Sequence, residues 1–458
     1  MLSNEENRLL TESGADTPMG GLMRRYWIPA LLSSELPPPD CTPVRVTLLG
    51  EDLVAFRDTD GRIGLLDRHC AHRGASLFFG RNEECGLRCV YHGWKYDVDG
   101  RCVDMPNEPE PLTGDEASAD RNHEASPLGA APRRFKTKVT ITAYPCVERG
   151  GVIWTYMGPP ELKPGVPELE WSAVPEPQRF HSKRLQECNW LQAMEGGIDS
   201  SHISFLHSGT PPLKKERAES IPAYMMTNSP ARDRGYHQRD TSPKFETVDT
   251  DYGMLIGARR EAEADSYYWR ITQWLFPWYT MIPPFGDGGI GGHAWVPIDD
   301  ESCWAWSFTW HPARPLDAEQ VEGMRQGQGI HSVFIPGTFR PAANRDNDYL
   351  IDREKQLYTS FTGIDGIGTQ DCAVQESMGR IYNRAREHLG SSDTAIIAAR
   401  RRLISALRDV ERGIGPPALD PDGYRVRSFS TVLPRDVPWA EGAKEGLVAR
   451  SDVFIASV

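Results

Sequence analysis

Two short Cys–His pairs are the residues of this sequence best suited to hold a metal centre. One residue separates Cys70 from His72, two separate Cys89 from His92, and sixteen lie between the pairs. Thiolates and imidazoles are both metal ligands, so a fold that brings the pairs together offers two of each. The stretch 67–96 therefore predicts a metal centre held by two loops.

Two kinds of centre fit four such ligands. Structural zinc sites take Cys2His2 sets, but their usual spacing puts both cysteines before both histidines. In a Rieske [2Fe–2S] centre one iron takes two thiolates and the other two imidazoles, so each loop gives one ligand to each iron. The interleaved order, with Gly74 and Gly93 in the loops and Trp94 after the second, favours the iron–sulfur cluster. Such a cluster accepts single electrons and passes them on.

The stretch resembles the Rieske family, down to the run His72-Arg-Gly and the run Tyr91-His-Gly-Trp. The resemblance implies a small antiparallel domain with the two ligand loops at its tips. A structural zinc protein remains the alternative reading of these residues.

A second constellation is Asp199-x-x-His202-x-x-x-x-His207. We expect residues 189–206 to form a helix, on which Asp199 and His202 share a face because they are three residues apart. A kink or helix end near Ser204 lets both imidazoles converge. Two histidines and one carboxylate on one side of an iron leave positions open for O2 and substrate. The alternative is a helix with two ordinary histidines.

This spacing resembles that of the Rieske non-haem iron oxygenases, and the likeness runs from the cluster to the last long helix. The third ligand must be a distant carboxylate, for which Asp365, Asp371 and Glu376 are candidates. The run beginning Gln370-Asp resembles the signature of the phthalate dioxygenase-like branch, where this Asp binds iron. We therefore expect Asp371, with Glu376 as the alternative.

The family also implies an assembly, a homotrimer or a multiple of trimers. In it, Asp199 links a cluster ligand of the neighbouring subunit, His92, to His202. The alternative is that Asp199 only orients His202. Glu195 precedes the motif and receives no assigned role.

The implied fold class is α+β: an N-terminal all-β Rieske [2Fe–2S] domain and a C-terminal α+β helix-grip (START-like) catalytic domain with an antiparallel sheet. The expected segments are an N-terminal segment packing on the catalytic domain, a Rieske domain with an inserted loop, the mononuclear iron domain and a tail. Their bounds are 1–42, 43–160 with the loop near 107–134, 161–430 and 431–458.

Hydrophobic patterning predicts the main elements. One short helical segment is expected before residue 26, helical spacing marks 369–389, and long loops are expected at 208–245. An amphipathic helix is expected at 393–412, ending at Gly413. The expected strands are 44–49, 53–57, 63–66, 90–96, 137–145, 151–157, 253–259, 267–276, 292–297 and 303–310.

The amino-acid composition limits the kinds of partner that this protein can bind. The formal charge of −13 over 458 residues argues against nucleic acid and anionic membranes. The first residues show no secretory signal, and no apolar run reaches a membrane-spanning length. Of the nine cysteines, the seven outside the cluster are scattered and are expected to be free thiols, as in a reducing cytoplasm.

The expected function is that of a terminal oxygenase. No nucleotide-binding loop is evident, so electrons must come from a separate NAD(P)H-dependent flavin/iron–sulfur reductase. The resemblance implies cis-dihydroxylation of an aromatic carboxylate of the phthalate type. The alternatives are O-demethylation or aryl-ether cleavage of an aromatic acid, and, outside enzymes, a Rieske electron-transfer protein.

A carboxylated substrate requires cations in the pocket. Four arginines lie in the relevant region, of which Arg232 and Arg259 are the expected substrate contacts; the others are Arg234 and Arg260.

Overall fold

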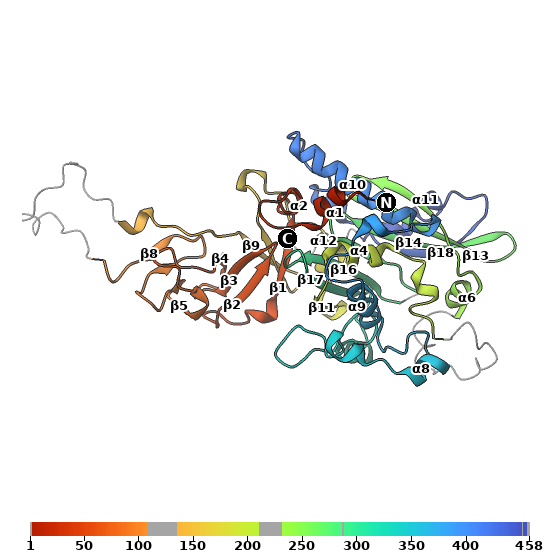
Figure 1. Ribbon diagram of the computed structural model, residues 1–458, viewed down its shortest axis with the longest axis horizontal. Helices are drawn as coiled ribbons and strands as arrows, with labels where there is room; N and C mark the ends of the chain where they lie inside the picture. The colour runs from red at the N-terminus through yellow and green to blue at the C-terminus, as the bar shows by residue number, and fades with distance from the viewer. Residues whose placement is uncertain (1, 109–134, 210–230, 286–287, 451, 456–458) are drawn as a thin grey trace, which may run out of the picture. The chain divides into compact units, whose positions relative to one another are not determined.

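The computed structural model describes residues 2–108, 135–209, 231–285, 288–450 and 452–455, and of 231–234 and 455 only the backbone. Two compact units form: one from Ile28–Met157, the other from Met1–Trp27 with Gly158–Val458 (Figure 1). The expected segment 1–42 is thus divided at Trp27. The expected insertion at 107–134 lies, beyond residue 108, outside the described residues.

The described residues of the Ile28–Met157 unit form three small sheets, which confirms the expected all-β domain. The antiparallel pairs β2–β3 and β3–β4 build one sheet, β5 to β8 build another, and β9 and β10 pair beside β1. The strands are β1 (Trp27–Leu32), β2 (Val44–Leu48), β3 (Glu51–Arg57), β4 (Ile63–Asp67), β5 (Arg81–Glu83), β6 (Gly86–Arg88), β7 (Lys95–Tyr96), β8 (Cys102–Asp104), β9 (Cys146–Arg149) and β10 (Val152–Tyr156).

Two strands predicted for this unit are much shorter in the structure or are replaced by isolated bridges. Of residues 90–96 only β7 is a strand, because the preceding residues close a ligand loop. Residues 137–145 make only isolated bridges, at Thr140 and Ala143, after the 3-10 turn Phe135–Lys138. Alternating β-branched residues resemble a strand in sequence, but a strand also needs a neighbouring edge along its length.

The second unit is built on one antiparallel sheet, in the order β11-β17-β16-β15-β14-β13-β12, with β18 pairing to β14. This confirms the expected antiparallel catalytic sheet. The strands are β11 (Arg179–Gln186), β12 (Lys244–Thr250), β13 (Gly253–Glu261), β14 (Ser266–Leu275), β15 (Tyr279–Ile282), β16 (Ile290–Pro297), β17 (Cys303–Trp310) and β18 (Phe429–Pro434).

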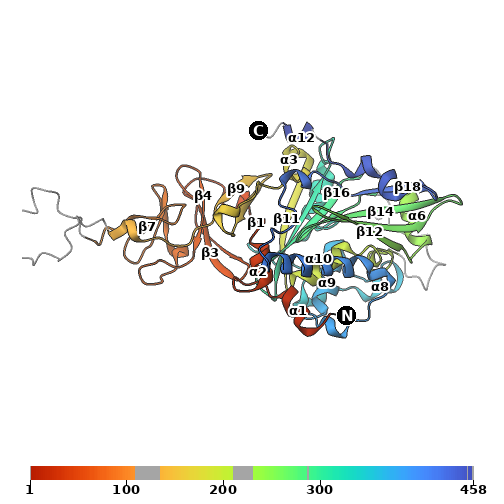
Figure 2. The same ribbon diagram turned by 90° about the horizontal axis from the view of Figure 1, so that it is seen from above.

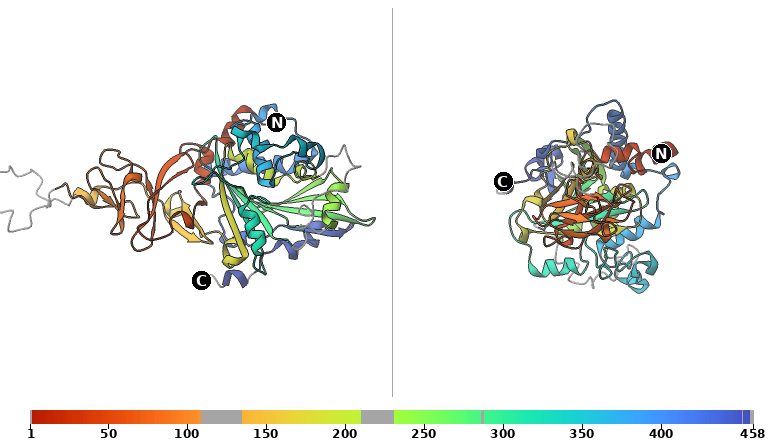
Figure 3. Two further views of the ribbon diagram at one scale, coloured as in Figure 1. Left: turned by 90° about the horizontal axis from the view of Figure 1, so that it is seen from below. Right: turned by 90° about the vertical axis from the view of Figure 1, so that its left-hand side faces the viewer.

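Helices cover one face of this sheet (Figures 2 and 3). Helix α4 (Trp190–Ile198) contacts β14, β15 and β16, and α9 (Ile367–Ser377) packs against α4. Helix α10 (Thr394–Glu411) contacts β12 and the two N-terminal helices, α1 (Asn4–Thr11) and α2 (Pro18–Met23). On the other face Trp439 of α11 (Trp439–Gly442) stacks on Trp269, with ring centroids 5.3 Å apart.

The helix predictions hold in part. Helix α10 confirms the expected amphipathic helix at 393–412. The helix expected over 189–206 is too long, since α4 ends at Ile198. The helical spacing at 369–389 yields α9, which ends at Ser377. Where loops were expected, α6 (Ala231–Arg239) forms.

Further short elements complete the second unit: α3 (Glu170–Ala173), α7 (Ala318–Arg325), α8 (Arg353–Tyr358), α12 (Asp452–Ile455) and 3-10 turns. Among the described residues, no helix has the length and apolar character needed to cross a bilayer.

Candidate metal centres

The chain leaves helical geometry immediately after α4, and this break creates the first site. Gly197 lies against the sheet, where an added Cβ would come within 2.1 Å of the Trp295 ring. Asp199 is extended (φ −84°, ψ 119°), and its carboxylate accepts a hydrogen bond from the Ser201 backbone N–H at 2.6 Å. A side chain that accepts a hydrogen bond from a backbone N–H two residues ahead favours a turn over continuation of the helix. The chain then turns back and presents His202.

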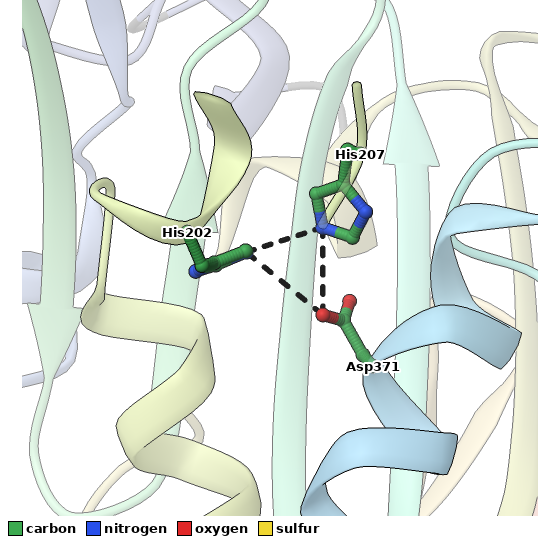
Figure 4. Close-up of side chains that lie close together, drawn as sticks. All are labelled: His202, His207 and Asp371. Carbon is green, nitrogen blue, oxygen red and sulfur yellow. Dashed lines mark hydrogen bonds and ion pairs between the residues drawn. The ribbon is translucent and has the colours of Figure 1, made fainter. Parts of the chain in front are cut away.

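Three side chains converge beside this turn (Figure 4). Nε2 of His202 and Nε2 of His207 are 3.1 Å apart. Oδ1 of Asp371, from α9, lies 3.4 Å from Nε2 of His207 and 3.9 Å from Nε2 of His202. Three ligand atoms from two distant segments therefore surround one small volume.

The other nitrogen of each imidazole has its own partner. His202 Nδ1 lies 3.2 Å from Asp199 Oδ2, and His207 Nδ1 lies 2.7 Å from Gln370 Oε1. The Gln370 amide donates through Nε2 to the Ile364 carbonyl at 2.7 Å, so its oxygen faces His207. When each Nδ1 carries the proton, both Nε2 lone pairs point into the shared volume.

The charges of the site favour a bound cation. Burial disfavours the Asp371 carboxylate, but His207 and then His202 outweigh it and lower the pKa of Asp371 to about 2. Burial also opposes protonation of His202, yet its hydrogen bond to Asp199 and the charge of Asp371 leave its pKa raised. Nearby carboxylates thus stabilise positive charge here.

Two histidines and one carboxylate are the donor set of a mononuclear non-haem iron centre. The two Nε2 atoms and the carboxylate oxygen lie within 4.8 Å of one another, and the outer partners hold the proton of each imidazole on Nδ1. The residues therefore fit an Fe(II) ion with positions left for O2 and substrate.

The competing carboxylates lie elsewhere. Asp365 is exposed and pairs with Lys355 at 2.7 Å. Glu376 accepts from the Glu187 backbone N–H at 2.9 Å and from the Tyr349 hydroxyl at 2.5 Å. Both oxygens of Glu376 are thus engaged away from the two histidines.

Glu195, which received no role from the sequence, joins a buried ion network. Its carboxylate accepts from Arg384 at 3.0 Å and from Arg400 at 2.6 Å, and Arg384 also donates to Asn7 at 3.1 Å. Arg384 is fully buried and Arg400 is 3% exposed. The network fastens α4 to α1 and α10, and so holds the helix that carries the metal turn.

The first unit brings the two Cys–His pairs together in loops of matching geometry. The N–H of Gly74 donates to the Cys70 carbonyl at 2.9 Å, and the N–H of Gly93 donates to the Cys89 carbonyl at 3.0 Å. Both glycines have positive φ, +73° and +80°. Glycine adopts this conformation without a steric penalty, which explains its place after each pair.

Burial divides the four ligands by type. Cys70 and Cys89 are 3% and 2% exposed, whereas His72 and His92 are partly exposed with ring centroids 4.4 Å apart. Burial and then the adjacent Cys70 thiol raise the pKa of Cys89, so two thiolates need the positive charge of a metal. Thiolates inside and imidazoles outside match a [2Fe–2S] cluster with one iron of each kind.

Three further observations support this fit. Nδ1 of His72 is buried and has no hydrogen-bond partner among the described residues, as a ligand atom would. The Tyr96 hydroxyl lies 3.2 Å from Cys70 Sγ. Trp94 stacks on His72 with centroids 4.5 Å apart.

The candidate substrate arginines occupy different places. Arg259 lies over the Tyr267 ring at 4.3 Å, on the sheet face opposite to Arg260, because neighbouring residues of a strand point to opposite faces. The structure does not bring Arg259 to the histidines. The side chains of Arg232 and Arg234 lie outside the described residues.

A buried cluster of two arginines and a neutral histidine, Arg260, Arg270 and His237, lies beside the metal turn; we call it the cationic cluster after its arginines. Arg260 is fully buried and Arg270 is 3% exposed, on one face of β13 and β14. Burial and then Arg270 lower the pKa of Arg260 to about 10. His237 packs against Tyr268 and Phe285; burial, followed by the two arginines, lowers its pKa, so it stays neutral.

Sequence reasoning missed Arg270, His237 and the role of Gln370. The sequence offered one signal for Arg270, which stands between Trp269 and Ile271 on a strand expected to line the cavity. For His237 the sequence carried no comparable signal, because its helix was read as a loop.

Comparison with known proteins agrees with both centres. The Rieske [2Fe-2S] domain family matches residues 26–119, and the family described as LigXa C-terminal domain like matches residues 155–451. The 3-chlorobenzoate-3,4-dioxygenase oxygenase subunit of Comamonas testosteroni is 38% identical over 98% of this chain and 100% of its own. The phthalate 4,5-dioxygenase oxygenase subunit of Pseudomonas putida is 36% identical over 100% of this chain and 98% of its own.

Two more distant proteins extend the comparison. The 5,5'-dehydrodivanillate O-demethylase oxygenase subunit of Sphingobium sp. is 31% identical over 98% of this chain and 90% of its own. Among solved structures, dicamba monooxygenase bound to 3,6-dichlorosalicylic acid superposes with a TM-score of 0.54 at 19% identity, covering 85% of this chain and 98% of that one. This last likeness concerns the fold.

Proposed function

Because this chain belongs to the Rieske aromatic-ring-hydroxylating oxygenases, as an oxygenase α subunit, we propose that it cis-dihydroxylates an aromatic carboxylate of the phthalate type. The convergence of His202, His207 and Asp371 in a chain that also carries a Rieske domain is the observation that supports this most directly. A Rieske electron-transfer protein has no use for the second donor set.

Each donor group has a defined part. Cys70, His72, Cys89 and His92 hold the cluster, and the two histidines with Asp371 hold the iron. When bound, the cluster supplies single electrons and the iron supplies O2 activation beside the substrate. Asp199 and Gln370 keep the Nδ1 protons in place, so that both imidazoles present Nε2.

The substrate carboxylate would be held by the cationic cluster beside the metal turn. Arg260 and Arg270 place two guanidinium groups on the sheet face that meets this turn, and buried arginines recognise carboxylates by paired hydrogen bonds. The relatives named for 3-chlorobenzoate and phthalate point to the same substrate class.

Asp199 would also serve electron transfer between subunits. Its Oδ2 faces His202, and its side chain is 24% exposed. In a homotrimer, or a multiple of trimers, the carboxylate would accept a hydrogen bond from His92 of the neighbouring subunit. Electrons would come from a separate NAD(P)H-dependent reductase. Nine cysteines without a disulfide suit a cytoplasmic location.

A single-turnover experiment tests the proposed function. The protein, with its cluster reduced and iron bound, is mixed with O2 and one of phthalate, 3-chlorobenzoate or a methoxybenzoate, and products are identified by mass spectrometry. A dihydrodiol acid supports the proposal. A phenol with formaldehyde would instead establish O-demethylation, the reaction class of the Sphingobium relative. Cluster reoxidation without any oxidised acid would overturn the substrate class.

A further inference from the structure

Arg260 joins the cationic cluster to the metal turn through its own guanidinium group. Its Nη2 donates to the Ser200 carbonyl at 2.7 Å, and its Nε donates to the Asp240 carbonyl at 3.1 Å. Ser200 lies between Asp199 and His202, and Asp240 follows α6. One side chain from the sheet thus fastens both the metal turn and the end of a helix.

The third nitrogen of the Arg260 guanidinium group, Nη1, differs from the other two in its hydrogen bonding. Nη1 of Arg260 is buried and has no hydrogen-bond partner among the described residues. Asp240 and Asp199 act on Arg260 through their charge, but neither accepts a hydrogen bond from Nη1. Both ring nitrogens of the adjacent His237 also lack hydrogen-bond partners among these residues. A buried donor without an acceptor is costly, and a bound anion would remove that cost.

The guanidinium group is planar and rigid, so its three nitrogens move together. An anion bound at Nη1 therefore fixes the orientation of Nη2, and with it the position of the Ser200 carbonyl. Arg270, two residues along on the adjacent strand, adds the positive charge that draws an anion to this point. A lysine carries the same charge but lacks the fork that reaches two carbonyls and an anion at once.

We propose that Arg260 is a positioning residue that transmits binding of the substrate carboxylate to the turn carrying Asp199 and His202. Occupation of Nη1 orders this turn, so electron transfer to the iron becomes fast only when an anionic substrate is present. This inference rests on the proposed function and adds to it the means by which substrate controls that site.

Hydrogen–deuterium exchange on the wild-type holoprotein provides the first test. Phthalate and 3-chlorobenzoate should slow amide exchange in the segment 199–207 by at least tenfold, whereas benzamide, a neutral analogue, should not. Equal slowing by the acids and the amide, or no slowing by a bound acid, would overturn the proposal. This measurement needs no variant and so does not depend on how a variant folds.

Variants of Arg260 distinguish its role in binding the substrate carboxylate from its role in positioning the metal turn. Arg260→Lys should bind phthalate within about fivefold of wild type, yet lose at least tenfold of the phthalate-dependent acceleration of cluster reoxidation. Arg260→Met should lose both binding and acceleration. Arg259→Lys is the matched control, because Arg259 lies on the opposite sheet face over Tyr267, and it should retain both.

The outcomes distinguish the two proposals. If Arg260→Lys keeps its iron and its cluster absorbance, and phthalate still accelerates cluster reoxidation as in the wild type, the proposed role of Arg260 is wrong. The proposed substrate class is not affected by that result. Failure of every aromatic acid to bind the wild-type protein would overturn the substrate class, and the transmission with it.

Discussion

Nδ1 of His207 lies 2.7 Å from Oε1 of Gln370, the residue that directly precedes Asp371. One turn of α9 therefore supplies both the candidate carboxylate ligand and the group that orients a candidate histidine ligand. The helix and the 202–207 loop are consequently coupled, and displacement of either changes the positions of two candidate ligands.

Gln370→Leu should weaken iron binding at the mononuclear site by about 10- to 100-fold, because His207 loses the acceptor that fixes its Nδ1 proton. Iron retention is measured against increasing chelator, with the cluster absorbance as internal reference. Val374→Ala, on the exposed side of α9, serves as the control and should retain iron as wild type does. Equal retention in both variants would remove Gln370 from the site.

Asp371→Ala should empty the mononuclear site and leave the Rieske cluster intact, since the two sites share no ligand. Metal analysis and the cluster spectrum distinguish them. The matched variant Asp365→Ala removes a carboxylate that pairs with Lys355 and should leave both metals in place. Full iron occupancy in Asp371→Ala would redirect the assignment to Glu376.

Asp199→Asn should keep both metals and yet slow electron transfer from the cluster to the iron by at least 100-fold, because the amide cannot bridge two histidines as a charged acceptor. The measurement is the rate of cluster reoxidation in a single turnover with substrate and O2. Normal turnover would contradict the bridge and leave Asp199 as a group that orients His202.

Glu195→Gln should destabilise the protein by about 3–5 kcal/mol at pH 7, because Arg384 and Arg400 lose their buried counter-ion. Burial raises the pKa of Glu195, but the two arginines outweigh it and leave the pKa below the ordinary value of 4.5. A lowered pKa means that the charged form stabilises the folded state above about pH 4.5 and that this contribution is lost as the pH falls further.

The difference in unfolding free energy between wild type and Glu195→Gln should therefore shrink below pH 4.5. Urea unfolding followed by tryptophan fluorescence at pH 7 and at lower pH measures it. The exposed Glu5→Gln provides a control with no expected effect. A difference that grows on acidification would contradict the assigned charge state.

Tyr96→Phe should lower the reduction potential of the cluster by on the order of tens of millivolts. The Tyr96 hydroxyl lies 3.2 Å from Cys70 Sγ. A metal-bound thiolate has no proton to give, so the hydroxyl would donate to the sulfur and stabilise the more negative, reduced state. Spectroelectrochemical titration gives the potential. Tyr91→Phe, whose ring is 56% exposed, should leave it unchanged. A higher potential in Tyr96→Phe would show that the hydroxyl does not donate to this sulfur.

The sequence by itself determined the ligand pairs, the two-domain order and the antiparallel catalytic sheet. These features depend on residues close together in the chain. The Cys–His spacing and the glycines specify the ligand loops, and the alternation of apolar residues along the strands specifies the sheet. Even the error in the length of α4 was local, since the Asp199 carboxylate bonds two residues ahead and ends the helix earlier than helical spacing suggests.

Only the tertiary structure decided which distant groups meet. Asp365, Asp371 and Glu376 are three carboxylates within one short stretch, and the sequence alone does not distinguish them as ligands. Packing of α9 on α4 turns only Asp371 of the three toward the histidines. Strand alternation puts Arg259 and Arg260 on opposite faces of the sheet, but only the packing of α4 on the sheet decides which of these faces meets the metal turn. Contacts between residues far apart in the chain depend on the packing of whole elements, which no local pattern encodes.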